Sequence, residues 1–164
     1  MKQNYSEMLN KNLRLRTVFM GERSQARRVA NEIGLVQMMR SETLVRTAER
    51  VTGFPLRRPP TLQVISYGAG DYTGPHNDHH PEEPEFRGGY VDVQLTLVSA
   101  GTAQQSLVYE YKGFLTEVAE VGQSGLAIYH LPFWHYTTPL VARAPRTRRW
   151  VLLATFAIQR KARS

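Results

Sequence analysis

The feature that most constrains the fold is a stretch in which hydrophobic and polar residues alternate strictly. From residue 91 to residue 97 the sequence is Val-Asp-Val-Gln-Leu-Thr-Leu. Successive side chains of a β-strand point to opposite faces, so this period of two predicts a strand with one apolar face. Shorter apolar segments occur at 62–67, 106–111, 126–129 and 150–158, separated by clusters of glycine, proline and aspartate. Many short strands predict a small barrel or jelly roll.

The first 53 residues have a different pattern, which predicts helices. Between residues 23 and 39, apolar residues at spacings of three and four form one helix face: Ala26, Val29, Ala30, Ile33 and Val36. A second helix is predicted from an N-cap at Ser41 to a stop at Gly53, with an apolar stripe of Leu44, Val45, Ala48 and Val51. Three prolines in residues 54–60 predict an extended connector.

Together these patterns predict a mainly β protein with N-terminal helices. We expect a single domain over residues 1–164, in which helices and connector (1–60) pack outside a β core (61–160).

Composition excludes several classes of protein. The 164 residues include no cysteine, which excludes disulfide scaffolds, thiolate zinc sites and a cysteine nucleophile. The sequence has no run of 18 apolar residues and no apolar signal core at its start, so we expect a cytoplasmic protein without membrane contact. The formal charge is +7, but the basic residues are scattered along the chain, and no specific nucleic-acid partner is expected.

Two potential metal ligands lie two residues apart, in the sequence Gly-Pro-His76-Asn-Asp78. On a strand this spacing places both side chains on one face, where an imidazole and a carboxylate can bind one divalent ion. A third ligand from elsewhere would complete a facial triad and leave three positions open. The neighbouring His79 and His80 could be further donors, substrate contacts or solvent-exposed residues.

A second group of candidate residues lies near the end of the sequence. His130 and His135 are surrounded by aromatic residues, and either could supply the third ligand. Arg146, Arg148 and Arg149 follow, and an arginine can bind a carboxylate through two parallel hydrogen bonds. Arg148 and Arg149 point to opposite faces of a strand, so at most one of them points into the barrel.

In this order, the two groups resemble the two catalytic motifs of the prolyl 4-hydroxylase branch of the 2-oxoglutarate/Fe(II)-dependent dioxygenases. The resemblance covers about residues 51–158. The first motif consists of residues 62–68 with Gly70, Tyr72, Pro75, His76 and Asp78. The second consists of His135, Pro139, Arg149, Trp150 and Val151.

The resemblance implies a double-stranded β-helix, which is a jelly-roll or cupin-like core, with Fe(II) bound by His76, Asp78 and His135. It implies that 2-oxoglutarate is the cosubstrate and that O2 is consumed, with succinate and CO2 as products. It also implies a cosubstrate site in which Arg149 pairs with the far carboxylate, Tyr67 donates a hydrogen bond, and Val93, Leu95 and Leu97 form an apolar wall.

Two assignments stay open at this stage, the arginine and the third histidine ligand. The interval between His135 and Arg149 is longer than is usual in the family, so residues 141–147 are predicted to form a longer loop, and Arg146 and Arg148 are rivals of Arg149. His130 is the rival of His135.

The resemblance predicts a hydroxylase of a small molecule or of an amino-acid or peptidyl side chain; the alternative is a jelly-roll protein that binds a metal or ligand without turnover. The oligomeric state is open. Residues 79–89 are predicted to form a loop beside the metal, and the candidate substrate contacts are Tyr72, His79, His80, Arg87 and Trp134.

Overall fold

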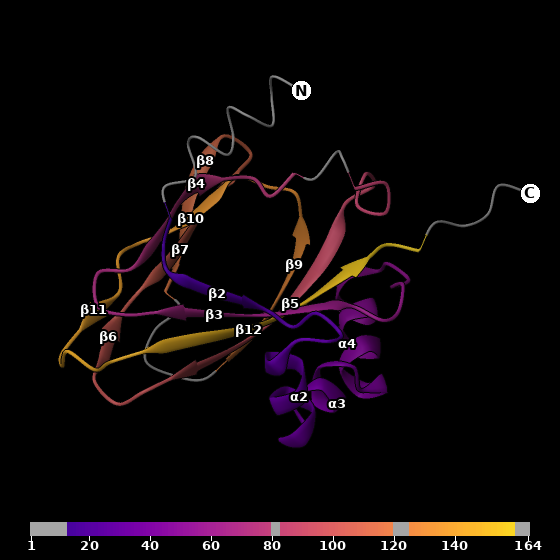
Figure 1. Ribbon diagram of the computed structural model, residues 1–164. Coiled ribbons are helices and arrows are strands. Elements are labelled where there is room, and N and C mark those ends of the chain that lie inside the picture. The colour runs from indigo at the N-terminus through magenta and orange to yellow at the C-terminus, as the bar shows by residue number, and fades with distance from the viewer. Residues whose placement is uncertain (1–12, 80–82, 120–124, 160–164) are drawn as a thin grey trace, which may run out of the picture.

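Strands are the main regular elements in the part of the chain that the computed structural model describes, namely residues 13–79, 83–119 and 125–159. Two five-stranded antiparallel sheets lie opposite each other (Figure 1). Sheet I has the order β2-β3-β12-β5-β9, with bounds Arg16–Phe19, Thr61–Tyr67, Arg149–Ala157, Tyr90–Val98 and Gly125–Leu131. Sheet II has the order β1-β4-β10-β7-β8, with bounds Leu13–Arg14, Tyr72–His76, His135–Thr137, Ser106–Tyr111 and Phe114–Ala119. The predicted mainly β architecture is therefore confirmed.

Three helices pack together against one face of sheet I: α2 (Gln25–Glu32), α3 (Leu35–Met39) and α4 (Glu42–Thr52). The ends of α4 are those that the sequence predicts. The hydroxyl of Ser41 accepts a hydrogen bond from the Leu44 N–H, and Gly53 adopts φ 74° after the last turn. No helix within the described ranges is long and apolar enough to cross a membrane.

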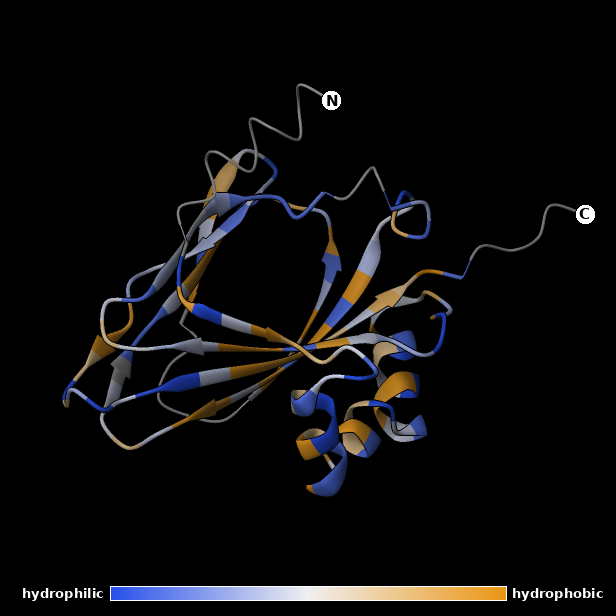
Figure 2. Cartoon of the chain, in the orientation of Figure 1, coloured by the Kyte–Doolittle hydropathy of each residue, from blue (hydrophilic) through white to orange (hydrophobic). Residues whose placement is uncertain are grey.

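The main hydrophobic core lies between these helices and sheet I. Its members from the sheet share one face of their strands: Leu62, Val91, Val93, Leu152, Ala154 and Phe156. Val45 and Ala48 of α4 are fully buried against them. Figure 2 shows the helices with both hydrophobic and hydrophilic segments, as expected for helices that cover a sheet on one side. The opposite face of sheet I is left to face sheet II.

The helical prediction for the first 53 residues is wrong in two respects. Residues 13–14 and 16–19 form β1 and β2, which extend the two sheets at their edges. The predicted helix 23–39 is interrupted by Gly34 at φ 75° and forms two shorter helices. Val29 and Ile33 are 48% and 70% exposed, whereas Ala30 and Val36 are buried as predicted. Val51 of α4 is also exposed, at 67%.

The predicted long loop before β12 contains a short strand. β11 (Val141–Ala142) pairs with β6 (Thr102–Gln104) in a separate two-stranded sheet. Residues 143–147 connect this strand to β12 and stay against the molecule, since the Arg143 N–H donates to the Gly101 carbonyl and Thr147 is buried. The extra length therefore leaves the register of β12 between β3 and β5 continuous from Arg149 to Thr155.

Candidate metal centre

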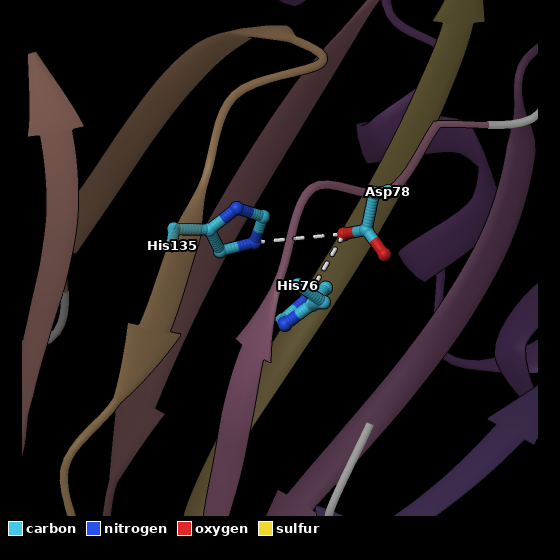
Figure 3. A group of neighbouring side chains, drawn as sticks. All are labelled: His76, Asp78 and His135. Carbon is cyan, nitrogen blue, oxygen red and sulfur yellow. Dashed lines mark ion pairs between the residues drawn. The ribbon is translucent and has the colours of Figure 1, made fainter. Parts of the chain in front are cut away.

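His76, Asp78 and His135 meet between the two sheets (Figure 3). His76 ends β4 and His135 begins β10, and the two residues are direct partners across the antiparallel pair. The Asp78 Oδ2 atom lies 3.2 Å from His76 Nε2 and 3.5 Å from His135 Nε2. One donor atom from each residue lies within 4.8 Å of the other two, and among the described residues this is the group of histidine, aspartate and glutamate side chains that could hold an ion.

Asp78 reaches this position through a turn rather than through strand alternation. β4 ends at His76, and Asp78 has a left-handed backbone with φ 52°. Aspartate is one of the few residues other than glycine that tolerate this conformation. The Tyr90 hydroxyl donates a hydrogen bond of 2.7 Å to the Asp78 carbonyl and so supports the turn. The two side chains therefore lie together as expected from their spacing, but strand alternation is not what brings them together.

Each imidazole is held in the same tautomer by a backbone carbonyl two residues before it. His76 Nδ1 lies 2.7 Å from the Gly74 carbonyl, and His135 Nδ1 lies 2.8 Å from the Phe133 carbonyl. A carbonyl oxygen only accepts, so each Nδ1 carries the proton and the neutral ring has its lone pair on Nε2. Two Nε2 lone pairs and one carboxylate oxygen thus converge on a common point.

This donor set fits a divalent transition metal. Ligand atoms bound at about 2.0–2.2 Å on one face of an octahedron are separated by about 3 Å, close to the spacings seen here. Two histidines and one carboxylate on a single face are the donor set of non-haem Fe(II) oxygenases, and they leave positions for other ligands. His76 is buried and His135 is half-buried, so an ion would be held at the wall of a cavity.

The three residues line a cavity of about 600 Å³ between the sheets. Its wall from β12 is formed by Arg149, Val151, Leu153 and Thr155. Trp150, by contrast, is 38% exposed and Leu152 packs against the helices. The predicted division of β12 into two faces is confirmed.

Arg149 is the arginine that points into the cavity. Its side chain is 1% exposed, its Nη1 donates a hydrogen bond of 2.7 Å to Gln105 Oε1, and its Nη2 lies 3.4 Å from Thr96 Oγ1. The rivals are placed elsewhere: Arg146 is exposed, and Arg148 is half-buried with its Nη1 bonded to the Thr147 carbonyl.

Tyr67 lies beside Arg149, as the sequence predicts. It is 4% exposed, its ring centroid is 5.3 Å from the guanidinium carbon, and its hydroxyl is 3.0 Å from Thr73 Oγ1. The sequence did not single out Thr73, Thr96 or Gln105, because their roles depend on contacts between distant strands.

Leu95 and Leu97 are not part of the cavity wall, and this prediction is wrong. Leu95 packs against the helix-side core with Val93, and Leu97 is 41% exposed on the same face of β5. The opposite face lines the cavity, and it carries Asp92 and Gln94. The alternating pattern identifies two faces, but the apolar face is covered by helices while the polar face meets the cavity.

The other candidate residues that the structure describes are not members of this cluster. His130 is exposed on β9, and its ring stacks on Phe54 at 4.5 Å, so His135 is the histidine that joins the cluster. His79 is exposed, and His80 lies outside the described residues. Tyr72, Arg87 and Trp134 do not line the cavity. Of the loop predicted beside the metal, residues 79–89, Glu83 and Phe86 line the cavity.

Two buried titratable groups on β5, Tyr90 and Asp92, line the same cavity as the candidate metal centre. Burial raises the pKa of the Tyr90 hydroxyl, and the charges of Asp78 and Asp92 raise it further. Burial also raises the pKa of Asp92 to about 7, with a smaller contribution in the same direction from Asp78 and an opposing one from its hydrogen bond with Thr155. The tyrosine therefore stays protonated and remains a hydrogen-bond donor to Asp78.

The fold is similar to that of solved 2-oxoglutarate/Fe(II) oxygenases. The structure is similar to a Pseudomonas putida prolyl-4-hydroxylase, with a TM-score of 0.55 and 13% identity over 92% of this chain and 74% of that one. It is also similar to SnoN, a non-haem α-ketoglutarate-dependent epimerase from nogalamycin biosynthesis, with a TM-score of 0.58 and 14% identity over 87% of this chain and 62% of that one.

A third similar structure is an oxidoreductase of the 2OG-Fe(II) oxygenase family from Burkholderia pseudomallei. Its TM-score is 0.53, with 13% identity over 98% of this chain and 82% of that one. At these identities the likeness shows a shared fold. No protein-family model matches the sequence, and no curated protein is similar to it in sequence.

Proposed function

We propose that this chain is a non-haem Fe(II)- and 2-oxoglutarate-dependent oxygenase of the prolyl 4-hydroxylase-like branch, built on a jelly-roll core. The observation that carries the proposal is the convergence of His76 Nε2, His135 Nε2 and Asp78 Oδ2 beside a cavity, with both Nδ1 atoms engaged by carbonyls. The shared fold of solved 2-oxoglutarate oxygenases supports it.

In this proposal His76, Asp78 and His135 hold Fe(II), which, when bound with 2-oxoglutarate, supplies the oxidation of a substrate by O2 with release of succinate and CO2. Tyr90 keeps the Asp78 turn in place through its hydrogen bond to the backbone carbonyl. The Nδ1–carbonyl contacts of both histidines fix the tautomer that leaves Nε2 available to the ion.

Arg149 binds the far carboxylate of 2-oxoglutarate. The buried guanidinium donates hydrogen bonds to Gln105 and Thr96, and its planar fork is suited to bind a carboxylate through two parallel hydrogen bonds. Gln105 is fully buried and donates its own Nε2 hydrogens to the carbonyls of Asp71 and Thr138, so it holds the guanidinium in a fixed position. Tyr67 covers the guanidinium on one side and excludes water from it.

The proposal is tested by measuring succinate formed from 2-oxoglutarate by the Fe(II)-loaded protein in air, with free amino acids, peptides, nucleosides and small amines as substrates. We expect succinate from the native protein and none from His76→Ala. His79→Ala removes a neighbouring, exposed imidazole and should behave like the native protein. Binding of 2-oxoglutarate without succinate under every condition would favour the alternative, a binding protein without turnover.

A further inference from the structure

The cavity contains a buried carboxylate that neither the metal ligands nor the cosubstrate site uses. Asp92 is 5% exposed, and it lies on the face of β5 that lines the cavity. Its Oδ1 accepts a hydrogen bond of 2.6 Å from Thr155 Oγ1, its direct partner on β12. Among the described residues, no lysine, arginine or histidine forms an ion pair with it.

A carboxylate in this position is costly unless a cation accompanies it, because burial removes the water that would stabilise the charge. The rise of the Asp92 pKa to about 7 has this cause. Over the rest of the molecule the charge has the opposite sign, since the whole chain carries a formal +7. The negative charge of Asp92 in the cavity is therefore a local feature of a basic protein.

Aromatic residues line the same cavity as the Asp92 carboxylate. Tyr129 of β9 is the direct partner of Asp92 on the other side of β5, and its ring centroid lies 6.0 Å from that of Phe133. Tyr90, two residues before Asp92 on the same face, lies 5.0 Å from Phe86. All of these residues line the cavity. The faces of aromatic rings attract cations, so the rings and the carboxylate favour the same kind of ligand group.

The carboxylate is remote from the guanidinium that we assign to 2-oxoglutarate. Arg149 and Thr155 share one face of β12 and are six residues apart, which corresponds to about 20 Å along a strand. Within the described part of the wall, Arg149 is the one lysine or arginine. The cavity thus has a cationic end at Arg149 and an anionic end at Asp92, and a dianionic cosubstrate is drawn to the first.

We infer that Asp92 binds an ammonium group of the primary substrate, with Tyr129 as an aromatic wall, so that the substrate is a small amine or a side chain that bears one. This inference rests on the proposed function, because it assumes that iron is bound in the cavity and that the primary substrate binds next to it, at the Asp92 end. It narrows the substrate to organic cations with apolar carbon next to the charge.

The test compares ligands of equal size that differ in charge. Affinities of 2-phenylethylamine and 2-phenylethanol, and of cyclohexylamine and cyclohexanol, are measured by calorimetry at pH 8 under anaerobic conditions. The full chain is used with Fe(II) and 2-oxoglutarate, and again without them. We expect each amine to bind about tenfold or more tightly than its alcohol, as a charge-assisted pair requires.

Two variants locate the preference. Asp92→Asn keeps the shape and the hydrogen bond from Thr155 but removes the charge, and the preference for amines should disappear. Glu117→Gln removes one exposed charge from β8, outside the cavity, and should retain it. A preference that survives in Asp92→Asn overturns the inference. So does equal or absent binding of amines and alcohols by the native protein, a comparison that needs no folded variant.

The visible absorption of the Fe(II)–2-oxoglutarate complex, recorded in the same samples, separates this inference from the proposed function. If the absorption appears but amines are not preferred, the amine-site inference is overturned and the oxygenase proposal is retained. An amine preference that depends on Asp92 without this absorption supports the cation site and overturns the oxygenase proposal.

Discussion

Replacing Arg149 by lysine tests how the cavity recognises its anionic ligand. Lysine keeps the positive charge but cannot present two parallel N–H groups in a plane. The native guanidinium is 1% exposed and is positioned by Gln105 at 2.7 Å. Gln105 keeps its two hydrogen bonds to the Asp71 and Thr138 carbonyls in the variant, so the surrounding wall should stay in place.

The magnitude follows from the loss of one charge-assisted hydrogen bond to the carboxylate. Such a bond contributes about 1.5–3 kcal/mol, which corresponds to an increase of about ten- to a hundredfold in the dissociation constant of 2-oxoglutarate. The charge remains, so binding is weakened and not abolished. The effect should appear mainly in the apparent KM for 2-oxoglutarate, with a smaller change in kcat, because the residue binds the cosubstrate away from the reacting atoms.

The matched control is Arg148→Lys, which makes the same chemical change at the adjacent residue. Arg148 is half-buried on the other side of the strand and bonds to the Thr147 carbonyl, so its replacement should change KM by less than about twofold. Succinate formation is measured over a range of 2-oxoglutarate concentrations, with Tm values to establish that both variants are folded. Equal effects, or a larger effect of Arg148→Lys, would refute the assignment of Arg149.

Two further predictions concern β5. Asp92 has its folded pKa raised to about 7 from an ordinary value of 3.8, so the native protein should lose stability as the pH rises from about 4 to 7, by at most about 4 kcal/mol. Chemical denaturation of the metal-free protein gives the free energy of unfolding of Asp92→Asn and of the native protein. Relative to the native value, that of Asp92→Asn should increase between pH 4.5 and pH 8. A difference that does not change with pH would contradict the raised pKa. Tyr90→Phe removes the hydrogen bond to the Asp78 carbonyl and should weaken Fe(II) binding by about tenfold, measured by equilibrium dialysis, whereas unchanged affinity would show that the Asp78 turn needs no such support.

Local chemistry explains which elements the sequence could predict. The N-cap Ser41 and the stop at Gly53 are decided within a few residues, and α4 begins and ends there. The two faces of β12 follow from strand alternation, which places Arg149 inside and Trp150 outside. His76 and Asp78 were proposed from residue types and spacing, and His135 from the resemblance to the dioxygenases; the structure brings the three side chains together.

What the sequence could not predict depends on which surface each element meets. On β5, alternation gives one apolar and one polar face, but only the packing of the helices shows that Leu95 faces them and that Asp92 faces the cavity. The same applies to α2, where Ala30 is buried and Ile33, on the predicted apolar face, is exposed. Gln105 could not be found from its neighbours in the sequence, since its partner Arg149 lies on a strand of the other sheet.

The position of Asp78 had a different origin from the one expected. Strand alternation would place it beside His76, but the strand ends at His76 and a left-handed turn brings the carboxylate back. That turn is held by Tyr90, a residue on the opposite sheet. A local pattern can thus name the ligands of a site while the geometry is set by a distant contact.

The most direct test of the central claim is an anaerobic titration of the protein with Fe(II) in the presence of 2-oxoglutarate, followed by visible absorption. We predict a metal-to-ligand charge-transfer band that saturates at one ion per chain. His135→Ala should abolish the band, and His130→Ala, which removes the exposed imidazole stacked on Phe54, should leave it unchanged. No band from the native protein, or a band of full intensity from His135→Ala, would contradict the proposed iron and 2-oxoglutarate site.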